Sequence, residues 1–211
     1  MVMRIAIIGA GNVGSALGRA WLKSGEEVVF GVPNPDDPKY GSLAKERLCA
    51  PPGAAQNSEI IVLGIPWPAT ETAVKSLGDL SDKILIDCTN PLGMGRDGLE
   101  LVLGQATSGG EQVAVWAKRA AVFKTLNQTG AENMETASLY PIRPVMFVAG
   151  DDEAKKPVVL LLVASLGFEA VDAGPLRNAR LLEAYGMLWI DQALYRGRGR
   201  SFAFALTDRA R

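Results

Sequence analysis

Residues 4–14 read RIAIIGAGNVG, a short apolar run followed at once by three glycines with the spacing G-x-G-x-x-G. The apolar run predicts a strand buried on both faces, and residues 15–24 follow with the apolar spacing of a helix. In such a strand–turn–helix unit, Gly9 lets the chain turn, Gly11 lets backbone N–H groups approach a pyrophosphate, and Gly14 lets helix and strand pack closely. The stretch therefore predicts a dinucleotide-binding turn.

The N-terminus of the helix after this turn is expected to face the anion. Its first backbone N–H groups have no partner within the helix, and the helix dipole favours negative charge there. We therefore expect Asn12 and Val13, with the three glycines, to contribute to the cofactor site.

Strand-like and helical segments alternate along the rest of the chain. Further strands are predicted at residues 27–31, 59–65, 83–89, 121–127, 145–149 and 168–172, and further helices at 41–48, 70–77, 151–166 and 176–195, with 112–117 readable as either. This alternation predicts an α/β fold, a Rossmann-type doubly wound and mostly parallel sheet with a small C-terminal helical portion. We place the dinucleotide-binding domain at residues 1–172 and the helical portion at 173–211.

Composition excludes several classes of function. The 211 residues are 48% hydrophobic and 21% charged, with a net charge of −1, so nothing in the charge balance favours nucleic acid or an anionic membrane as a partner. Histidine is absent, which excludes catalytic triads, Cys–His dyads and histidine-bound zinc. Cys49 and Cys88 form no metal-binding pattern, and the apolar runs are too short for a signal peptide or a membrane span. We expect a soluble cytoplasmic protein without a metal.

The end of the second predicted strand bears on which dinucleotide binds. An NAD site usually carries Asp or Glu there, but residues 29–34 read VFGVPN, with neither a carboxylate nor an arginine. Asn34 and Lys39 are the candidates for a 2′-phosphate contact, although Lys39 is equally consistent with a solvated loop lysine. NADP is weakly favoured, and NAD is not excluded.

Two loops follow predicted strands at the edge where ligands bind in an open α/β sheet. One contains Ile65, Pro66 and Trp67, and the other contains Asn90 and Pro91. We expect these residues beside the nicotinamide, with the alternative that the prolines simply end the strands.

The motifs together resemble the family of coenzyme F420-dependent NADP reductases (NADPH:8-hydroxy-5-deazaflavin oxidoreductases). The resemblance covers nearly the whole chain and is carried, beyond the glycine motif, by Ile65–Trp67 after Val62–Leu63, residues 123–134, residues 148–152, and residues 172–176 followed by Asn178, Ala179, Arg180 and Leu181. It implies a Rossmann domain with a small C-terminal portion, usually a homodimer, that moves hydride between NADP(H) and the deazaflavin. It extends more distantly to the reductase domain of ferric-reducing membrane proteins, which use NADPH and a flavin. Members with firm NADP preference carry arginine where this chain has Val32-Pro33.

Hydride transfer between two stacked rings requires only that the protein orient the rings, so no side chain is assigned a catalytic role. The acceptor, coenzyme F420 or a flavin-like ring, is expected to lie between turns that all follow strands. The residues expected to bind this small-molecule redox partner are Trp67, Asn127, Gln128, Gly174, Pro175 and Leu176.

Two other classes of function stay open. One is a dehydrogenase or reductase of a small metabolite, with Lys124 as a proton donor, although a salt-bridged strand lysine is the more common role of such a residue. The other is a non-catalytic dinucleotide sensor. Turnover with a ring acceptor distinguishes both from the first hypothesis.

Overall fold

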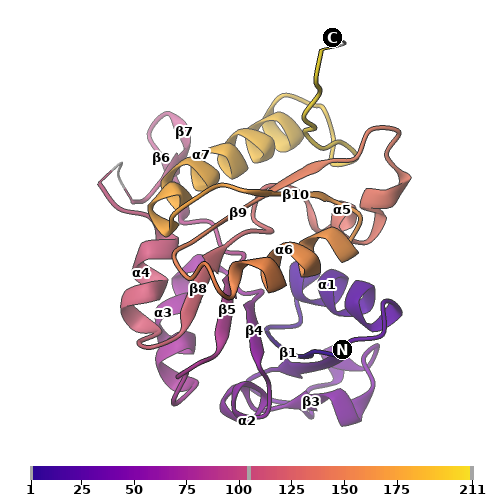
Figure 1. Ribbon diagram of the computed structural model, residues 1–211, viewed down its shortest axis with the longest axis vertical. Coiled ribbons are helices and arrows are strands. Elements are labelled where there is room, and N and C mark those ends of the chain that lie inside the picture. The colour runs from indigo at the N-terminus through magenta and orange to yellow at the C-terminus, as the bar shows by residue number, and fades with distance from the viewer. Residues whose placement is uncertain (1, 104–105, 210–211) are drawn as a thin grey trace.

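The computed structural model of the protein describes residues 2–103 and 106–209 (Figure 1). Its centre is an eight-stranded sheet in the order β10-β9-β8-β5-β4-β1-β2-β3. These strands are β1 (Arg4–Ile8), β2 (Glu27–Gly31), β3 (Leu48–Cys49), β4 (Ile60–Leu63), β5 (Ile84–Asp87), β8 (Ala121–Lys124), β9 (Val145–Gly150) and β10 (Glu169–Asp172). All neighbouring pairs are parallel except β8 and β9, which confirms the predicted Rossmann-type, mostly parallel sheet.

Helices cover both faces of the sheet. One face packs against α1 (Asn12–Lys23), α5 (Ala131–Thr136) and α6 (Lys156–Ser165), and the other against α2 (Pro51–Gln56), α3 (Trp67–Ser76) and α4 (Gly109–Trp116). The alternation along β1 shows why the strand is apolar throughout. Ile5 and Ile7 belong to the first core cluster, whereas Ala6 and Ile8 belong to the second.

From β1 the chain builds the sheet outward first in one direction, through β2 and β3, and then in the other, through β4 and β5. The direction of building reverses between β1 and β4, and β1 runs parallel to both β2 and β4. Doubly wound sheets bind ligands at such a switch point, outside the carboxyl ends of the strands. The glycine turn after β1 and the loop after β4 both lie there.

The far side of the sheet departs from the prediction. Strand β9 runs antiparallel to β8, with Phe123 opposite Gly150 and Lys124 opposite Ala149, and β10 runs parallel to β9. The turn after β10 therefore does not share a carboxyl edge with the loops after β4 and β5. Gly174, Pro175 and Leu176 were expected at the ligand because their turn was assigned to that edge, and this assignment is wrong.

Several local predictions are also corrected. Residues 41–48 form no α-helix: short 3-10 turns at Pro38–Tyr40 and Lys45–Arg47 lead into β3, because Leu48 pairs with Phe30 at the sheet edge. The ambiguous segment 112–117 belongs to helix α4, apart from its last residue, which caps the helix. Among the helices and strands, α2, α5, β3 and the antiparallel hairpin of β6 (Leu92–Gly95) and β7 (Gly98–Leu101) were not predicted.

The C-terminal helix α7 (Ala179–Ile190) follows a 3-10 turn at Leu176–Asn178 and ends in a π-turn at Asp191–Tyr195. It packs against α4 and β7 in the upper part of the molecule (Figure 1). The chain beyond it returns to the sheet, where the Val145 N–H donates to the Phe204 carbonyl at 2.9 Å. The division at residue 172 stays a prediction.

Candidate functional site

The turn between β1 and α1 is held together by its glycines. Gly9 has a φ of 97°, in the left-handed region that favours glycine. A Cβ atom there would lie 2.6 Å from Ile65 Cγ2 and 2.8 Å from the Gly64 carbonyl oxygen. A Cβ atom at Gly14 would collide with the Gly9 carbonyl oxygen. Both glycines therefore let the turn, the helix and the β4 loop approach one another.

Gly11, unlike Gly9 and Gly14, has open space around it. It is exposed, its φ is −77°, and a Cβ atom built on it would meet no atom within 4 Å. Gly11 is also the N-cap of α1, so the helix has no side-chain cap, and its first turn contains no acidic residue. The first N–H groups of α1 thus have no carboxylate from their own turn, which fits a pyrophosphate. Glu132 and Glu135 of α5 line a neighbouring cavity that Gly11 and Asn12 share, together with Arg19.

A crevice of about 280 Å³ lies between this turn and the loop after β4. It is lined by Gly11, Asn12, Val13, Leu63, Gly64, Ile65, Pro66 and Cys88. The structure thus brings together the predicted residues of the glycine turn with Ile65 and Pro66. None of the lining side chains is ionised, because burial, together with the neighbouring Asp87 carboxylate, raises the pKa of the Cys88 thiol.

Trp67, predicted to face both rings, packs elsewhere. Its ring lies 5.5 Å from that of Trp116 between centroids, and a Cβ atom on Gly109 would be 3.1 Å from it. Pro91 lies against the same glycine. Trp67 and Pro91 therefore hold the start of α4, and neither lines the crevice.

The predicted amide residues form a buried chain of hydrogen bonds. The Asn90 side chain donates to the Asn127 carbonyl at 2.8 Å, and Asn127 Nδ2 donates to Asn90 Oδ1 at 2.9 Å and to the Leu182 carbonyl at 3.0 Å. The Gln128 side chain exchanges two 3.0 Å hydrogen bonds with the backbone of Phe147. Asn127 and Gln128 are 4% and 2% exposed, so their amides fasten β8 to its neighbours and are not available to an acceptor ring.

The turn after β10 is likewise engaged with protein atoms. Gly174 has a φ of 81°, the Leu176 N–H donates to Asp151 Oδ1 at 2.8 Å, and the Leu176 side chain belongs to the core. Pro175 caps the 3-10 turn that leads to α7. None of these three residues lines the crevice.

Asn34 and Lys39 lie in the exposed loop after β2. Asn34 Oδ1 accepts from the Asp36 N–H at 3.2 Å, and Lys39 Nζ lies 2.9 Å from Asp37 Oδ2. The lysine that was expected to meet a 2′-phosphate is thus already paired with a carboxylate of its own loop.

A buried ion cluster lies beyond the crevice, at the ends of β5 and β8. Lys124 Nζ is 2.9 Å from Asp87 Oδ2, 2.9 Å from Glu183 Oε1 and 2.5 Å from the Thr89 carbonyl oxygen. Burial alone would lower the pKa of Lys124, but the two carboxylates raise it above its ordinary value, so the ammonium persists. Lys124 was a candidate from the sequence, whereas Glu183, the one acidic residue of α7, was not.

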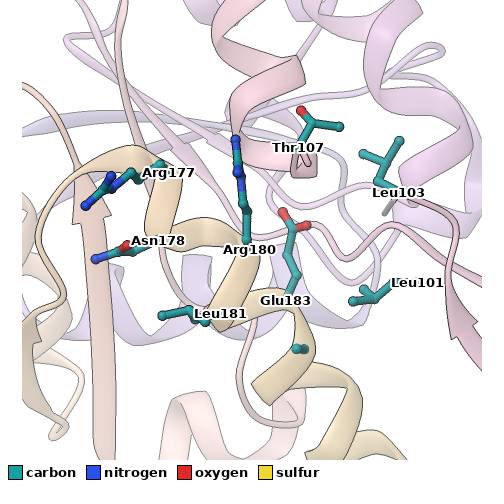
Figure 2. A pocket seen from close by; sticks show the side chains of 9 residues that line it. Leu101, Leu103, Thr107, Arg177, Asn178, Arg180, Leu181 and Glu183 are labelled. Carbon is teal, nitrogen blue, oxygen red and sulfur yellow. The ribbon is translucent and has the colours of Figure 1, made fainter. Parts of the chain in front are cut away.

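A larger cavity of about 680 Å³ opens at the start of α7. Leu101 and Leu103 lie on one side and α7 on the other, with Arg180 extending toward α4 (Figure 2). Arg180 forms two hydrogen bonds with Glu111 at 2.7 and 2.8 Å. This cavity shares no lining residue with the crevice at the glycine turn.

Comparisons with known proteins agree with this geometry. The family model "NADP oxidoreductase coenzyme F420-dependent" matches residues 4–91. The F420-dependent NADP reductase of Methanocaldococcus jannaschii is 25% identical over 217 residues, which cover 93% of this chain and 96% of that protein. The solved structure of a proposed F420-dependent NADP reductase from Arthrobacter sp. FB24 superimposes with a TM-score of 0.87 at 28% identity, covering 98% of this chain and 100% of the other.

A longer relative matches this chain over part of its own length. Metalloreductase STEAP3 of Rattus norvegicus is 28% identical over 184 residues, 86% of this chain. The aligned region makes up 36% of that relative, so the chain spans about a third of its length. Within the described ranges, no helix has the length and apolar character needed to cross a membrane.

Proposed function

Because this chain resembles the F420-dependent NADP reductases in sequence and fold, we propose that it is an oxidoreductase of the same kind. It would transfer a hydride directly between NADP(H) and a deazaflavin such as coenzyme F420. A flavin is the second candidate acceptor, as expected from the sequence. When bound, the two cofactors supply the redox chemistry between their rings. The chain supplies a site that binds them, orients them and excludes water.

The observation that carries this proposal is the lining of the crevice, which contains backbone groups and neutral side chains only. Reducing a ketone requires a proton donor beside the developing alkoxide, whereas hydride transfer between rings requires only alignment at near-attack distance. The crevice offers apolar surface from Val13, Leu63 and Ile65 and no acid or base.

The residues of the glycine turn fit the pyrophosphate of the nucleotide. The uncapped N-terminus of α1 would donate to it, and the open side of Gly11 would give it room. From there the nicotinamide half would extend along Ile65 and Pro66 toward Cys88. We propose NADP as the preferred nucleotide because the relatives are NADP reductases. The margin over NAD is expected to be modest, because the exposed Pro33 offers no charged group to a 2′-phosphate.

The structure weakens the alternative of a metabolite dehydrogenase that uses Lys124. The Lys124 side chain is fully buried and is held between two carboxylates, so it faces no substrate. A non-catalytic sensor would share the whole nucleotide site and is distinguished by activity alone.

The proposal is tested by following nicotinamide absorbance with NADPH and one acceptor at a time. We expect oxidation of NADPH with coenzyme F420, or with FMN, and none with small ketones or imines. Turnover of a ketone or imine without turnover of either ring would favour the metabolite reductase. Tight binding of NADPH without turnover of any acceptor would favour the sensor.

We also propose the homodimer and the cytoplasmic location expected from the sequence. Support for the dimer comes from the outer side of α7 and the hairpin β6–β7, where Leu181, Leu188, Tyr195 and Met94 are about half exposed or more. Exposed apolar groups that gather in this way are typical of subunit contacts. Sedimentation equilibrium measures the oligomeric state directly.

A further inference from the structure

The buried cluster of Lys124, Asp87 and Glu183 contains two carboxylates and one ammonium. Asp87 accepts from Lys124 and from the N–H and hydroxyl of Thr89. Glu183 accepts from the Gly109 and Gly110 N–H groups at 3.0 Å, and its Oε1 lies 2.9 Å from the ammonium. Apart from the Thr89 hydroxyl, which can donate or accept, every partner named here is a donor, and the Lys124 ammonium contacts both carboxylates. This arrangement favours the ionised form of both carboxylates.

The cluster therefore carries a net charge of −1 inside the protein. The side chains of Lys124, Asp87 and Glu183 are 0%, 0% and 3% exposed, so water screens this charge weakly. Among the described residues, the contacts that offset the second carboxylate come from neutral groups, the Thr89 hydroxyl and backbone N–H donors, including those at the start of α4.

This charge lies close to the crevice. Leu63, which lines the crevice, is the register partner of Asp87, and Asp87 is the register partner of Lys124. Because neighbouring strands are about 4.8 Å apart, the two groups lie roughly 5 and 10 Å from the crevice wall across the sheet. Cys88, directly after Asp87, lines the crevice itself.

We propose that the Lys124–Asp87–Glu183 cluster sets the preference of the site for the oxidised nucleotide over the reduced one. This inference rests on the proposed function, because it assumes that the nicotinamide lies at the β4–β5 end of the crevice. The nicotinamide ring is neutral in NADPH and carries one positive charge in NADP⁺, while the rest of the nucleotide is unchanged. A buried negative charge nearby therefore stabilises the oxidised ring selectively.

The same field acts during reaction. If a hydride passed from the nicotinamide C4 carbon to the acceptor ring, the nicotinamide would gain one positive charge, which the cluster would favour. The acceptor ring would gain one negative charge and would take a proton from solvent. The cluster touches neither ring, so it acts as an electrostatic positioning group.

The test compares dissociation constants of NADP⁺ and NADPH, measured separately by calorimetry, in wild-type protein and Glu183→Gln. The glutamine keeps one oxygen for the Gly110 N–H and the ammonium, loses the acceptor of the Gly109 N–H, and brings the cluster to neutrality. We expect the ratio Kd(NADP⁺)/Kd(NADPH) to rise roughly sixfold. Glu183 lies beyond Lys124 as seen from the crevice, and this is the size that Coulomb's law gives for one charge over about 15 Å at an effective dielectric constant of about 20. The control is Glu71→Gln on α3, which removes a half-exposed carboxylate paired with Lys75 and leaves the ratio unchanged.

An unchanged ratio in folded Glu183→Gln protein overturns the inference, as does an equal change in the control. If Glu183→Gln does not fold, Asp87→Asn makes the same change of charge and is expected to move the ratio in the same direction. In the wild-type protein the inference requires NADP⁺ to bind at least as tightly as NADPH, and the reverse order overturns it whatever the variants do. Absence of binding by either nucleotide would instead refute the proposed function.

Discussion

Replacing Gly11 by valine tests the nucleotide site with little risk to the fold. The Cβ atom would enter space with no atom within 4 Å, and the φ of −77° is one that valine adopts. The three added carbons would lie over the first N–H groups of α1, where the pyrophosphate is expected. Loss of two charge-assisted hydrogen bonds, each contributing about 1.5–3 kcal/mol, weakens NADP(H) binding by roughly 100-fold or more.

The stability of this variant is expected to fall only slightly. A glycine N-cap replaced by a β-branched residue costs about 1 kcal/mol, or roughly 2–4 °C in Tm for a chain of this size. Calorimetric titration with NADPH and a thermal melt measure the two effects. The matched control is Gly53→Val in α2, where an added Cβ atom also meets nothing within 4 Å and which does not line the crevice. Unchanged NADPH affinity in folded Gly11→Val protein would refute the site.

Four further predictions follow from single side chains. Pro33→Arg adds a guanidinium after β2 and is expected to raise the preference for NADP over NAD by roughly 1–3 kcal/mol in competition titrations; an unmoved ratio would show that no 2′-phosphate lies there. Thr125→Val removes a buried hydroxyl that has no hydrogen-bond partner among the described residues, so Tm is expected to stay level or rise by a few degrees, and a clear fall would contradict this. Trp67→Ala removes the contact with Trp116 and is expected to lower the free energy of unfolding by roughly 2–3 kcal/mol while leaving NADPH affinity within about twofold; a selective loss of affinity would place Trp67 at the nucleotide. Lys124→Met leaves two buried carboxylates without their cation and is expected to cost roughly 3–5 kcal/mol in urea unfolding, and a cost below about 1 kcal/mol would contradict the cluster's ionisation.

The parts of the site that could be predicted from the sequence are those set by local backbone geometry. The turn at Gly9 and Gly14 requires glycine because no other residue fits its φ and its close approaches, and such a requirement is readable in eleven residues. The parallel order of the central strands follows from the alternation of apolar runs and helices. Ile65 joins the site because β4 neighbours β1, which is the usual consequence of that order.

The parts that could not be predicted depend on contacts between distant segments. The sequence cannot distinguish whether the amides of Asn90, Asn127 and Gln128 bind a ligand or the protein backbone, because the same donor and acceptor groups serve both. In the structure they bind one another and the backbone of Phe147. Trp67 follows a strand end as a ligand-contacting residue would, but α4 offers Trp116 as a partner. In each case burial against another element decides the role.

The reversal of β9 accounts for the wrong expectations at the end of β8 and after β10, though not for that of Trp67. An all-parallel sheet would place the turn after β10 at the ligand edge and would leave Asn127 and Gln128 facing solvent at the end of β8. Because β9 runs antiparallel, its first residues extend past the end of β8, where the Phe147 backbone meets Gln128. The chain then returns through β10 to α7, which brings Glu183 to Lys124 and Leu182 to Asn127. The strand reversal thus converts three polar groups at the end of β8 into fixed structural contacts, and it leaves the ligand edge to β1, β4 and β5.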